Sequence, residues 1–506
     1  MRFHGEGMYQ WDTWYFATDD EVHAFYLQQL RPNSDRTQWD ADSIGHAVSR
    51  NLVDWEELPP VVPPAEPGSE GDLVNWTGST VEMDGTYYLF YTIRSSSSDA
   101  REQTIGLATS PDLYSWTKHP ANPVLTPDPR WYNTVDAPGP AGVVDCRDLM
   151  VVKHPSRPGW FGVFATRINT QEPAEGAVFA GAYSEDLVHW EQTPPVLRSA
   201  ENKWTIVEMP DLFEFEGRWY LTWLEDNNYG NREVLGDYHL SSGTLYAVSD
   251  VVEGPYVAPD GNVILASMGF NGISCRTVVF RGVTYVLYTS CERENENELK
   301  PTFGVLSLPK EVRVVDGRLR AVFAPLVLEE LGAGLIIDPE ALPALETAHT
   351  THETRVDWTP LDGGRRAAVR TAWARETYAP VATDFYAEMS VTLEEGVAAG
   401  MVVRQDGTKG GVALLDVEKQ RVMFCTIGRF QVVDMRELEL VHGRTYRLAV
   451  VGNGEFIEVY VDDVLTLQFV WYGPRQGRLG MLVDRGTATF GPMTATALAT
   501  RQGATA

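Results

Sequence analysis

The sequence predicts an all-β protein in which a five-bladed β-propeller is followed by a C-terminal β-sandwich. Three observations predict it: a repeated segment in the first two thirds of the chain, five aromatic or β-branched runs, and a late series of short strand patterns separated by turn residues. A chain of 506 residues is also too long for one ordinary hydrophobic core, so two domains are expected.

The repeat has the form Ser-x-x-Leu-x-x-Trp. It occurs at residues 49–55, 110–116 and 184–190, and a degenerate copy follows near Ser249. The intervals between copies are about the length that a four-stranded propeller blade needs with its loops. We therefore expect blades, not helices, to set the period of this part of the chain.

Short runs rich in aromatic and β-branched residues predict one strand in each blade. Most of them follow a turn signal such as Asp84-Gly85 or Glu216-Gly217, as strands in hairpins do. A propeller gathers the innermost strand of every blade around one channel, so residues far apart in the sequence can meet there. The runs lie at residues 22–27, 86–92, 160–166, 218–224 and 283–289.

A second domain is expected after the propeller. Residues 325–352 form an Ala/Leu/Pro/Glu-rich stretch, expected as a linker with one helical turn, between a propeller at 1–324 and a two-sheet sandwich at 353–506. Turns with Gly, Asp and Asn separate the strand patterns of the sandwich. These patterns lie at residues 385–393, 400–404, 411–417, 421–427, 446–451, 456–461, 464–470 and 480–483.

Composition excludes several classes of partner. The formal charge of −29, from 41 Lys and Arg against 70 Asp and Glu, would repel nucleic acid and an anionic membrane. Cys146, Cys275, Cys291 and Cys425 lack CxxC spacing, which argues against a zinc site or a dense disulfide framework and predicts mostly buried thiols. No metal cluster is visible in the sequence, and no cofactor is expected. The first residues lack a signal-peptide pattern, so a cytoplasmic protein is expected, or a secreted one if a leader has been removed.

Three acids stand in unusual settings, each within an aromatic or apolar segment with the pattern of an inner propeller strand. They are Asp12, among tryptophans and tyrosines, Asp148, in a Val-rich segment, and Glu208, in a segment that begins at Trp204. A charge among such neighbours is costly unless it is paired or functional. Cleavage of a glycosidic bond commonly needs two carboxyl groups, one to attack or to activate water and one to protonate the leaving oxygen.

Taken together and in this order, these segments resemble glycoside hydrolase family 32, the invertase, inulinase and levanase group, which shares its propeller with family 68. Asp12 falls where the family's Trp-Met-Asn-Asp-Pro-Asn-Gly motif has its nucleophile. Arg147 and Asp148 fall on its Arg-Asp-Pro motif, and Glu208 falls on its Glu-Cys motif. Supporting matches lie at residues 44–59, 76–91 and, in the C-terminal domain, 446–463.

The resemblance implies a role for each acid. Asp12 would attack the anomeric carbon, Glu208 would act as general acid and base, and Asp148 would hold two sugar hydroxyls. Arg147 would orient Asp148 or Glu208, although a structural ion pair between blades is an equally good interpretation. Apolar surroundings are expected to raise the pKa of Glu208, so that it carries a proton near neutral pH.

The motif positions around the acids are changed. Trp11 and Trp14 replace both asparagines of the nucleophile motif, Thr13 replaces its proline, Leu149 replaces the proline of the second motif, and Met209 replaces the cysteine of the third. Those asparagines help to position the sugar in the family. We therefore expect an altered specificity, with sucrose a poor substrate.

Several further residues fall on or beside positions that line the sugar pocket in the family, with blade packing as the alternative interpretation for each. Asp226 and Asn227 follow a predicted strand and are expected near the same mouth. His46 resembles a ligand, but a buried histidine that hydrogen-bonds between strands is the favoured interpretation. The pocket candidates are Trp11, Trp14, Gln28, Trp39, Trp76 and Ser79.

The predicted function is that of a retaining glycoside hydrolase acting on β-fructofuranosides through a covalent intermediate. Water or a second sugar would accept the fructosyl group, giving fructan hydrolysis or fructosyl transfer. The partner would be an oligosaccharide or polysaccharide that contains a furanose. One alternative is a glycosidase for another furanose, such as an arabinofuranosidase. The other is a sugar-binding propeller without turnover, and the retained acids argue against it.

Overall fold

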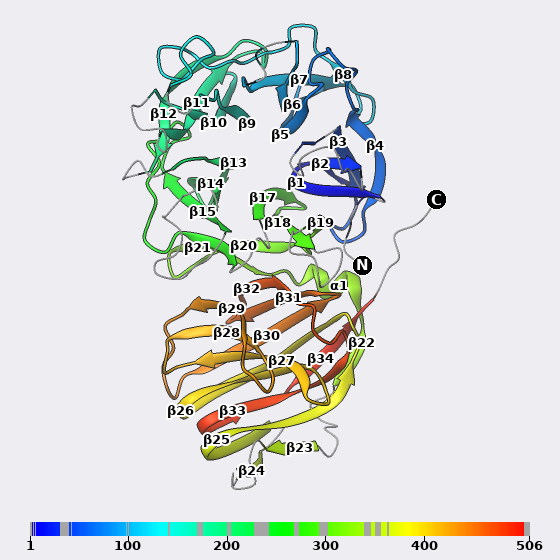
Figure 1. The fold of residues 1–506 in the computed structure, drawn as a ribbon, viewed down its shortest axis with the longest axis vertical. Coiled ribbons are helices and arrows are strands. Elements are labelled where there is room, and N and C mark those ends of the chain that lie inside the picture. Colours follow the sequence, from blue (N-terminus) through cyan, green and yellow to red (C-terminus); the bar gives the residue numbers. More distant parts are fainter. Residues whose placement is uncertain are drawn as a thin grey trace.

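The computed structural model describes residues 3, 5, 7–30, 40–41, 43–97, 99, 101–139, 142–169, 176–199, 204–226, 242–267, 273–292, 302–337, 346–349, 356–361 and 364–499. In this part the chain is all-β apart from one short helix, α1 (Leu326–Leu331). Figure 1 shows a ring of small sheets with a larger body of long strands beside it. The predicted propeller and C-terminal sandwich are therefore both present.

Four separate four-stranded antiparallel sheets make up most of the ring in the described residues. Each has its strands in sequence order across the sheet, as a propeller blade does. The first two sheets are β1 (Met8–Ala17), β2 (Val22–Leu30), β3 (Ser43–Ser49) and β4 (Glu56–Val62), then β5 (Val74–Met83), β6 (Thr86–Arg94), β7 (Thr104–Ser110) and β8 (Thr117–Lys118). The next two are β9 (Cys146–Lys153), β10 (Trp160–Arg167), β11 (Ala177–Ser184) and β12 (Glu191–Arg198), then β13 (Glu208–Phe215), β14 (Arg218–Asp226), β15 (Ser242–Ser249) and β16 (Val263–Ser267).

The repeated Ser-x-x-Leu-x-x-Trp segment forms the turn after the third strand of a sheet. Its serine ends β3, β7 and β11, and its leucine is buried with a positive φ, 62° at Leu52 and 66° at Leu187. The Oγ atoms of Ser49 and Ser184 each accept a hydrogen bond of 2.8 Å from the backbone N–H of that leucine. The repeat therefore marks the same corner in successive sheets.

The last strands of the ring are continuous with the C-terminal sheet. β17 (Ile273–Phe280), β18 (Val283–Glu292), β19 (Thr302–Leu306), β20 (Lys310–Val315) and β21 (Arg318–Phe323) pair in order, and β21 also pairs with β32 of the sandwich. The first strands of all these sheets contact one another in a closed circuit, β1 with β5, β5 with β9, β9 with β13, β13 with β17 and β17 with β1. Side chains on these first strands consequently face a common centre.

Parts of the interval expected as a linker pair with strands of the C-terminal body. Of that interval, α1 is helical, β22 (Gly332–Ile337) pairs with β34, and β23 (Glu346–His349) pairs with β25. The long strand β26 pairs with β30 over its first half and with β27 over its second. The remaining strands are β24 (Val356–Leu361), β25 (Gly364–Val381), β26 (Phe385–Asp406), β27 (Lys409–Asp416), β28 (Arg421–Thr426), β29 (Val432–Glu437), β30 (Thr445–Asn453), β31 (Phe456–Val461), β32 (Val464–Val470), β33 (Gly477–Phe490) and β34 (Thr494–Leu498).

A buried polar cluster joins the sandwich to the propeller. Glu458 of β31 accepts hydrogen bonds from the hydroxyls of Tyr288, at 2.6 Å, and Tyr460, at 2.7 Å, and it pairs with the Lys310 ammonium. All four side chains are buried. Because separating them would leave charges unpaired in an apolar cluster that spans both domains, the two bodies are held in one arrangement.

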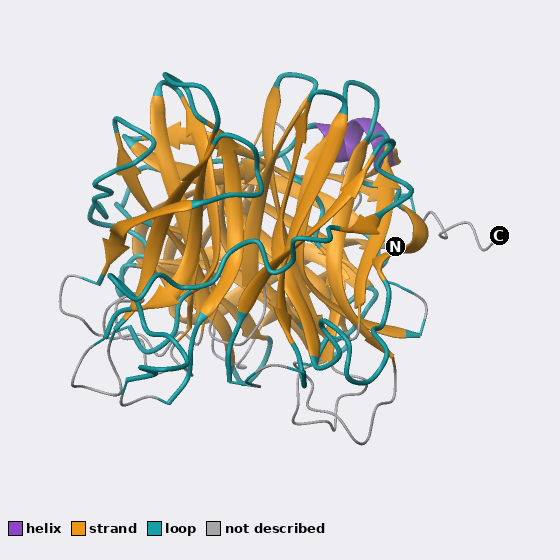
Figure 2. Cartoon of the chain, turned by 90° about the horizontal axis from the view of Figure 1, so that it is seen from above, coloured by secondary structure: helices purple, strands orange, loops and turns teal. Residues whose placement is uncertain are grey.

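The view from above shows that strands dominate the part of the chain that the structure describes (Figure 2). No helix in the part of the chain that the structure describes is long and apolar enough to span a membrane. Three of the four cysteines, Cys146, Cys275 and Cys425, are buried free thiols, as predicted. The side chain of Cys291 lies outside the described residues.

Candidate active site

The first strand of each sheet around the ring, as far as the structure describes it, has an irregular register. The register of β1 shifts between Trp11 and Thr13, at Asp12, and that of β5 shifts between Trp76 and Gly78. Similar shifts occur in β9, β13 and β17 next to Asp148, after Glu208 and before Arg276. A bulge re-aims a side chain that a regular strand would send to one face of the sheet. The irregularities thus turn side chains from all these strands towards the centre.

Three residues at these bulges have left-handed backbone conformations. φ is 33° at Asp12, 59° at Asp148 and 56° at Met209. Such conformations cost about 1–3 kcal/mol for a non-glycine residue and are typical of functional sites, where the surrounding structure imposes them. Two of the three acids predicted from the sequence therefore sit at strained positions, and the third precedes one.

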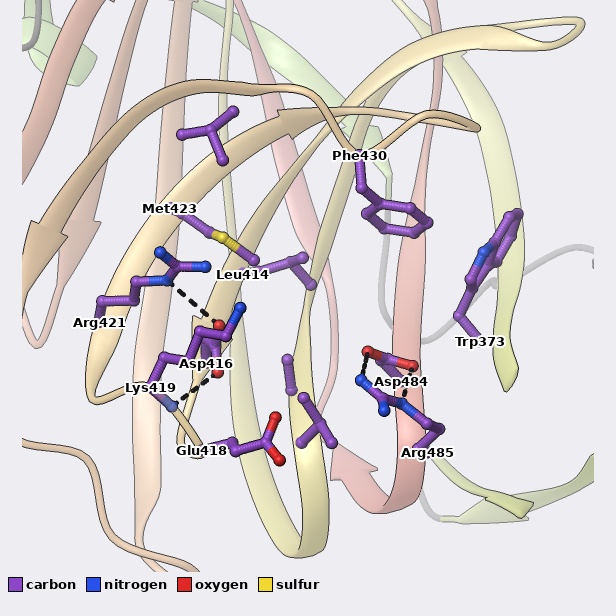
Figure 3. A pocket seen from close by; sticks show the side chains of 13 residues that line it. Trp373, Leu414, Asp416, Glu418, Lys419, Arg421, Met423, Phe430, Asp484 and Arg485 are labelled. Carbon is purple, nitrogen blue, oxygen red and sulfur yellow. Dashed lines mark hydrogen bonds and ion pairs between the residues drawn. The ribbon is translucent and has the colours of Figure 1, made fainter. Parts of the chain in front are cut away.

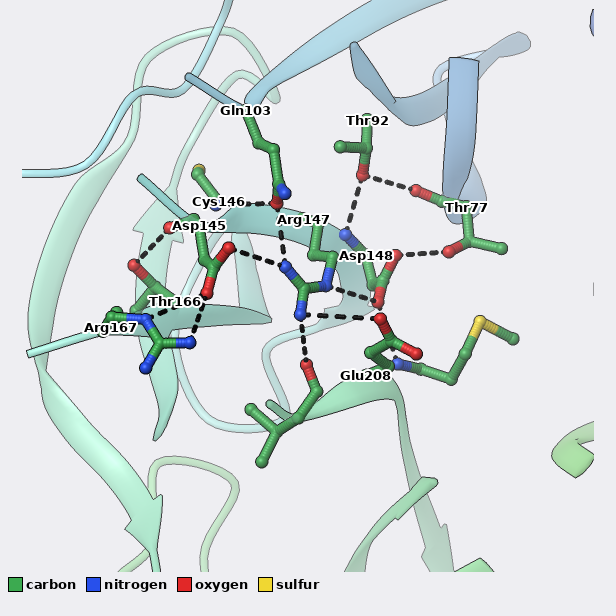
Figure 4. Close-up of polar contacts among 12 residues, drawn as sticks. Thr77, Thr92, Gln103, Asp145, Cys146, Arg147, Asp148, Thr166, Arg167 and Glu208 are labelled. Atoms are coloured by element: carbon green, nitrogen blue, oxygen red, sulfur yellow. Dashed lines mark hydrogen bonds and ion pairs between the residues drawn. The ribbon is translucent and has the colours of Figure 1, made fainter. Parts of the chain in front are cut away.

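The Asp148 carboxyl group is fixed by hydrogen bonds from two other strands. Its side chain is buried, Oδ1 accepts a hydrogen bond from the Thr77 hydroxyl, and Oδ2 accepts one of 2.9 Å from the backbone N–H of Met209. The backbone N–H of Asp148 donates to the Thr92 hydroxyl at 2.9 Å. These contacts, drawn in Figure 4, tie β5, β6, β9 and β13 together around one carboxylate.

Arg147 links the carboxyl groups. Its Nη1 lies 3.0 Å from Oδ1 of Asp145, its Nη2 3.6 Å from Oε1 of Glu208, and its Nε 3.9 Å from Oδ2 of Asp148 (Figure 4). Nη1 also donates to the side-chain oxygen of Gln103 at 2.9 Å. Burial disfavours the charged guanidinium, but the surrounding carboxylates outweigh burial and raise the pKa of Arg147. Arg147 therefore contacts Glu208 among the predicted acids and also forms an ion pair with Asp145.

A second arginine supports Asp145. The Nε and Nη2 atoms of Arg167 lie 3.1 and 3.0 Å from Oδ2 of Asp145, and Nη2 also donates to the carbonyl oxygen of Thr205 at 2.5 Å. Burial would raise the pKa of Asp145, but Arg147 and Arg167 outweigh it and hold the pKa below its usual value. Asp145 therefore favours its ionised form and helps to fix the position of the Arg147 guanidinium.

Glu208 differs from the other acids because it favours its protonated form. It begins β13 and is half-buried, and burial raises its pKa to about 8. Arg147 lowers this pKa, whereas the negative charges of Asp148 and Asp12 raise it further. Asp12 is half-buried too and lies close enough for its charge to act on Glu208. A carboxyl group with a raised pKa thus lies beside two other carboxyl groups. Acid–base catalysis needs such a difference in pKa between neighbouring groups.

The predicted pocket residues prove to be mostly packed. Trp14 is buried, and its indole N–H donates to the Thr80 hydroxyl at 3.1 Å. Ser79 joins β5 to β9, donating to the carbonyl oxygen of Leu149 at 2.8 Å and accepting from the N–H of Val151 at 3.1 Å. These contacts favour blade packing for Trp14 and Ser79.

The remaining pocket candidates lie in different settings. Trp11 is buried in the apolar cluster that also contains Trp14, whereas Trp76 is half-buried with the Arg94 guanidinium 5.7 Å from its ring centre. Gln28 is buried and donates to Ser43 at 2.9 Å, and Asp226 is fully buried at the end of β14. Trp39 and Asn227 lie outside the described residues.

His46 behaves as the favoured interpretation predicted. Its Nε2 lies 2.8 Å from Nδ1 of His23 on the neighbouring strand, and both rings are buried. Burial, and secondarily His23, lower the pKa of His46 to about 3. His46 therefore joins two strands of one sheet.

Sequence reasoning missed the residues that hold the acids. Thr77 binds Asp148 directly, Thr92 binds its backbone, and Arg167 fixes Asp145. A signal for Thr77 existed, because residues two apart on a strand share a face and Ser79 was already a candidate. Arg167 ends β10, and its nearby sequence contained no signal for a contact with a residue 22 positions earlier.

A separate hollow of about 330 Å³ opens on the sandwich (Figure 3). Trp373 and Phe430 form part of its wall, and Asp416 and Asp484 on its sides are paired with Arg421, at 3.2 Å, and Arg485, at 3.1 Å. None of the predicted site residues lines it. The hollow is therefore distinct from the group of acids in the propeller.

The sequence matches a known family model over most of the propeller. The model describes the glycosyl hydrolases family 32 N-terminal domain, and it matches residues 13–322. Two curated relatives are a sucrose:sucrose 1-fructosyltransferase of Festuca arundinacea, 31% identical over 38% of this chain, and beta-fructofuranosidase 1 of Zea mays, 36% identical over 21%. The matched regions span 28% and 16% of the length of these relatives.

Solved structures agree over nearly the whole chain. A GH32 beta-fructofuranosidase of Bombyx mori superposes with a TM-score of 0.69 at 17% identity, covering 98% of this chain and 93% of its own. The sucrose-6-phosphate hydrolase of Lactobacillus gasseri superposes with a TM-score of 0.71 at 13% identity, covering 99% and 93%. At such low identity these similarities establish the fold, the propeller with its sandwich.

Proposed function

This chain belongs to glycoside hydrolase family 32, and from that premise we propose that it cleaves β-fructofuranosides with retention of configuration, through a covalent glycosyl-enzyme intermediate. The observation that carries the proposal is the grouping of Glu208, whose pKa is raised to about 8 by burial, with the carboxyl groups of Asp148 and Asp12. Retaining glycosidases need this pairing of an acid with a nucleophile.

A carboxyl side chain is available for each step of the proposed reaction. Asp12 attacks the anomeric carbon of the fructosyl unit while Glu208 gives its proton to the leaving oxygen. Glu208, now ionised, then takes a proton from the incoming water or sugar hydroxyl, which attacks the same carbon and releases Asp12. Two displacements at one carbon give net retention.

The setting of Glu208 suits both halves of this cycle. Burial favours its protonated form before the first step, and Arg147, 3.6 Å away, favours its charged form after it. Asp148 accepts hydrogen bonds from Thr77 and Met209 and keeps further lone pairs for sugar hydroxyls. A sugar-binding propeller without turnover would have no use for a glutamate with a raised pKa, so the retained acids support an enzyme.

The substrate class follows from the family and its members. The curated relatives are named for β-fructofuranosidase and fructosyltransferase activities, and one solved relative is a fructan 1-exohydrolase of Cichorium intybus in complex with 1-kestose. These names favour a fructoside over an arabinofuranoside. The substrate proposed here is a fructose-containing oligosaccharide or polysaccharide.

The finer architecture is also a proposal. β17 to β20 would serve as the fifth blade, supported by the closed circuit of contacts among β1, β5, β9, β13 and β17. The propeller would then end near Phe323, and the sandwich would begin at β22, which pairs with β34.

Product analysis tests the function. Purified protein is incubated with sucrose, inulin, levan and arabinan, and the products are separated by thin-layer chromatography. Fructose release from a fructoside is expected, and longer fructo-oligosaccharides at high sugar concentration would indicate transfer. Arabinose release alone, or no product from any fructoside with a folded protein, would contradict the proposal. The inactive Asp12→Asn variant serves as the control.

A further inference from the structure

The hollow on the sandwich is built by one row of side chains that crosses five neighbouring strands. In the register of the sheet each member lies directly opposite the next, so all of them project from the same face. From β25 through β33, β26 and β27 to β28, the row consists of Trp373, Asp484, Ala398, Asp416 and Arg421, and all five line the hollow.

This row faces away from the main core of the sandwich. The residues that follow Ala398 and precede Asp416 and Asp484 along their strands are Ala399, Leu415 and Val483, and they belong to the largest apolar cluster of the C-terminal domain. Successive residues of a strand point to opposite faces. In the row, the small side chain of Ala398 has a carboxyl group on either side, two strand spacings or roughly 10 Å apart. The hollow therefore lies over Ala398, where the sheet has little side-chain volume.

Two half-buried aromatic rings form one wall. Trp373 of β25 and Phe430, which precedes β29, meet edge to face with their ring centres 5.5 Å apart (Figure 3). The Arg375 guanidinium lies 5.2 Å from the centre of the indole ring and helps to fix its position. Apolar ring surface left in water has a free-energy cost, so a ligand that covers these rings gains affinity.

The charged groups of the hollow balance one another. Nε of Arg421 lies 3.2 Å from Oδ2 of Asp416, and Arg485 makes two contacts with Asp484, of 3.1 and 3.2 Å. A charged ligand would have to compete with these pairs, whereas a neutral one would not. The lining is neutral overall, in a chain of charge −29, because three acids and three bases contribute to it: Asp416, Glu418 and Asp484, and Lys419, Arg421 and Arg485.

A neutral ligand with an apolar face and many hydroxyl groups fits both walls. Carboxylates paired with an arginine keep lone pairs for hydroxyl donors, and the guanidinium groups keep N–H donors for hydroxyl oxygens. A saccharide has this character, since its ring presents C–H groups on a face and hydroxyls at the edge. The volume of about 330 Å³ is at the lower end for small-molecule sites, which suits a short segment of a glycan chain.

We propose that the sandwich hollow is a second carbohydrate-binding site, which holds one segment of a neutral polysaccharide while another segment is cleaved in the propeller. The identification of that polysaccharide as a fructan rests on the proposed function. Trp373 and Phe430 provide the stacking surface, and the Asp416 and Asp484 pairs provide the hydrogen-bonding groups. Binding at two places raises the effective concentration of the chain at the acids, so the hollow acts on long substrates and not on short ones.

Kinetics with long and short substrates test this effect. Trp373→Ala removes part of the aromatic wall, so kcat/KM on levan or inulin is expected to fall about 3- to 10-fold, while kcat/KM on 1-kestose keeps its wild-type value. Trp373→Phe retains an aromatic ring and should recover most of the loss. Trp358→Ala is the matched control, because Trp358 is also a half-buried tryptophan of the sandwich but packs on Phe490, with ring centres 6.3 Å apart, and does not line the hollow.

Binding is measured directly with the full-length Asp12→Asn variant, which leaves the glycan intact. In affinity electrophoresis, levan or inulin in the gel should retard this protein, and the added Trp373→Ala change should remove part of the retardation. If Trp373→Ala does not fold, Phe430→Ala decides.

Two outcomes would overturn the proposal: unchanged retardation and polymer kinetics in a folded Trp373→Ala or Phe430→Ala variant, or equal loss of kcat/KM on 1-kestose and on the polymer. Retardation of Asp12→Asn that depends on Trp373, without cleavage of any fructoside by the wild-type protein, would instead contradict the proposed function and support the binding site.

Discussion

The Nη2 atom of Arg147 lies 3.6 Å from Oε1 of Glu208, and the pKa of Glu208 is nevertheless raised to about 8. Burial has the larger effect, and the negative charges of Asp148 and Asp12 add to it. Arg147 does not bind Glu208 alone, since it also lies 3.0 Å from Asp145. One cation shared among several carboxyl groups does not offset the effect of burial, so Glu208 favours its protonated form, which is the form that donates to a leaving group.

The basic limb of the pH profile of kcat/KM should report the ionisation of Glu208. As pH rises through about 8, Glu208 loses its proton and kcat/KM is expected to fall. In Arg147→Gln the cation that favours ionised Glu208 is gone, so the basic limb should move to higher pH even as kcat decreases. A movement to lower pH would show that Arg147 does not act on Glu208.

The same pKa predicts a pH dependence of stability. The pKa of Glu208 is raised in the folded state above its ordinary value of 4.5, so its contribution to stability is complete below that value and is lost as pH rises through about 8. Glu208→Gln cannot ionise and lacks this loss. Thermal unfolding should therefore show Glu208→Gln gaining on wild type between about pH 5 and about pH 9. A constant difference in Tm across this range would contradict the raised pKa.

The nucleophile can be tested with little structural change. Asp12 has a φ of 33°, and asparagine tolerates positive φ nearly as well as aspartate does, so Asp12→Asn should fold normally. Its amide cannot attack the anomeric carbon, and kcat should fall by several orders of magnitude. Circular dichroism and thermal unfolding provide the folding control. Near wild-type turnover would remove Asp12 from the mechanism.

The acids could be predicted from the sequence, and their supports could not. Asp12, Asp148 and Glu208 stand in local patterns of aromatic and apolar residues that are visible along the chain. Thr77 and Arg167 act through bulges and side chains that cross from one sheet to another, and such pairings leave no local pattern. Local signals left substrate contact and blade packing open for Trp14 and Ser79, because a strand pattern shows that a side chain faces inward but does not show whether it meets substrate or a neighbouring strand.

The segment expected as a linker also shows that local composition does not predict pairing between distant strands. Residues 325–352 have the composition of a connecting segment, yet β22 and β23 within them pair with strands far along the chain. The partner of β22 is β34, at the end of the described residues. Non-local pairing of this kind depends on the finished sandwich, so local composition gave no indication of it.

Substrate preference should reflect the motif changes around Asp12. Trp11 and Trp14 stand where the family has asparagines that help to position the sugar, and both are buried. Sucrose is therefore expected to be a poor substrate, with kcat/KM below that for a larger fructan or another fructoside. Initial rates on sucrose, 1-kestose and inulin compare these directly. Sucrose hydrolysis as efficient as that of an ordinary invertase would show that the tryptophans are tolerated.

The role of Glu208 can be separated from the identity of the substrate by changing the leaving group. A general acid contributes roughly 10²–10⁴-fold where the leaving oxygen is basic and needs a proton. Glu208→Ala should therefore be severely slow on a natural fructoside and much less impaired in the first step on an activated aryl fructofuranoside. Burst kinetics on the aryl substrate measure that first step.

The second step of the reaction, measured with the Glu208→Ala variant, gives a more specific test. Without a general base at position 208, the fructosyl-enzyme formed on Asp12 should accumulate, because water is poorly activated. Azide needs no base, so it should accelerate turnover and give a fructosyl azide with the starting anomeric configuration. Nuclear magnetic resonance of the product determines that configuration. Equal loss on both substrates would exclude Glu208 as the acid, and an inverted azide adduct would mean that Asp12 forms no covalent intermediate.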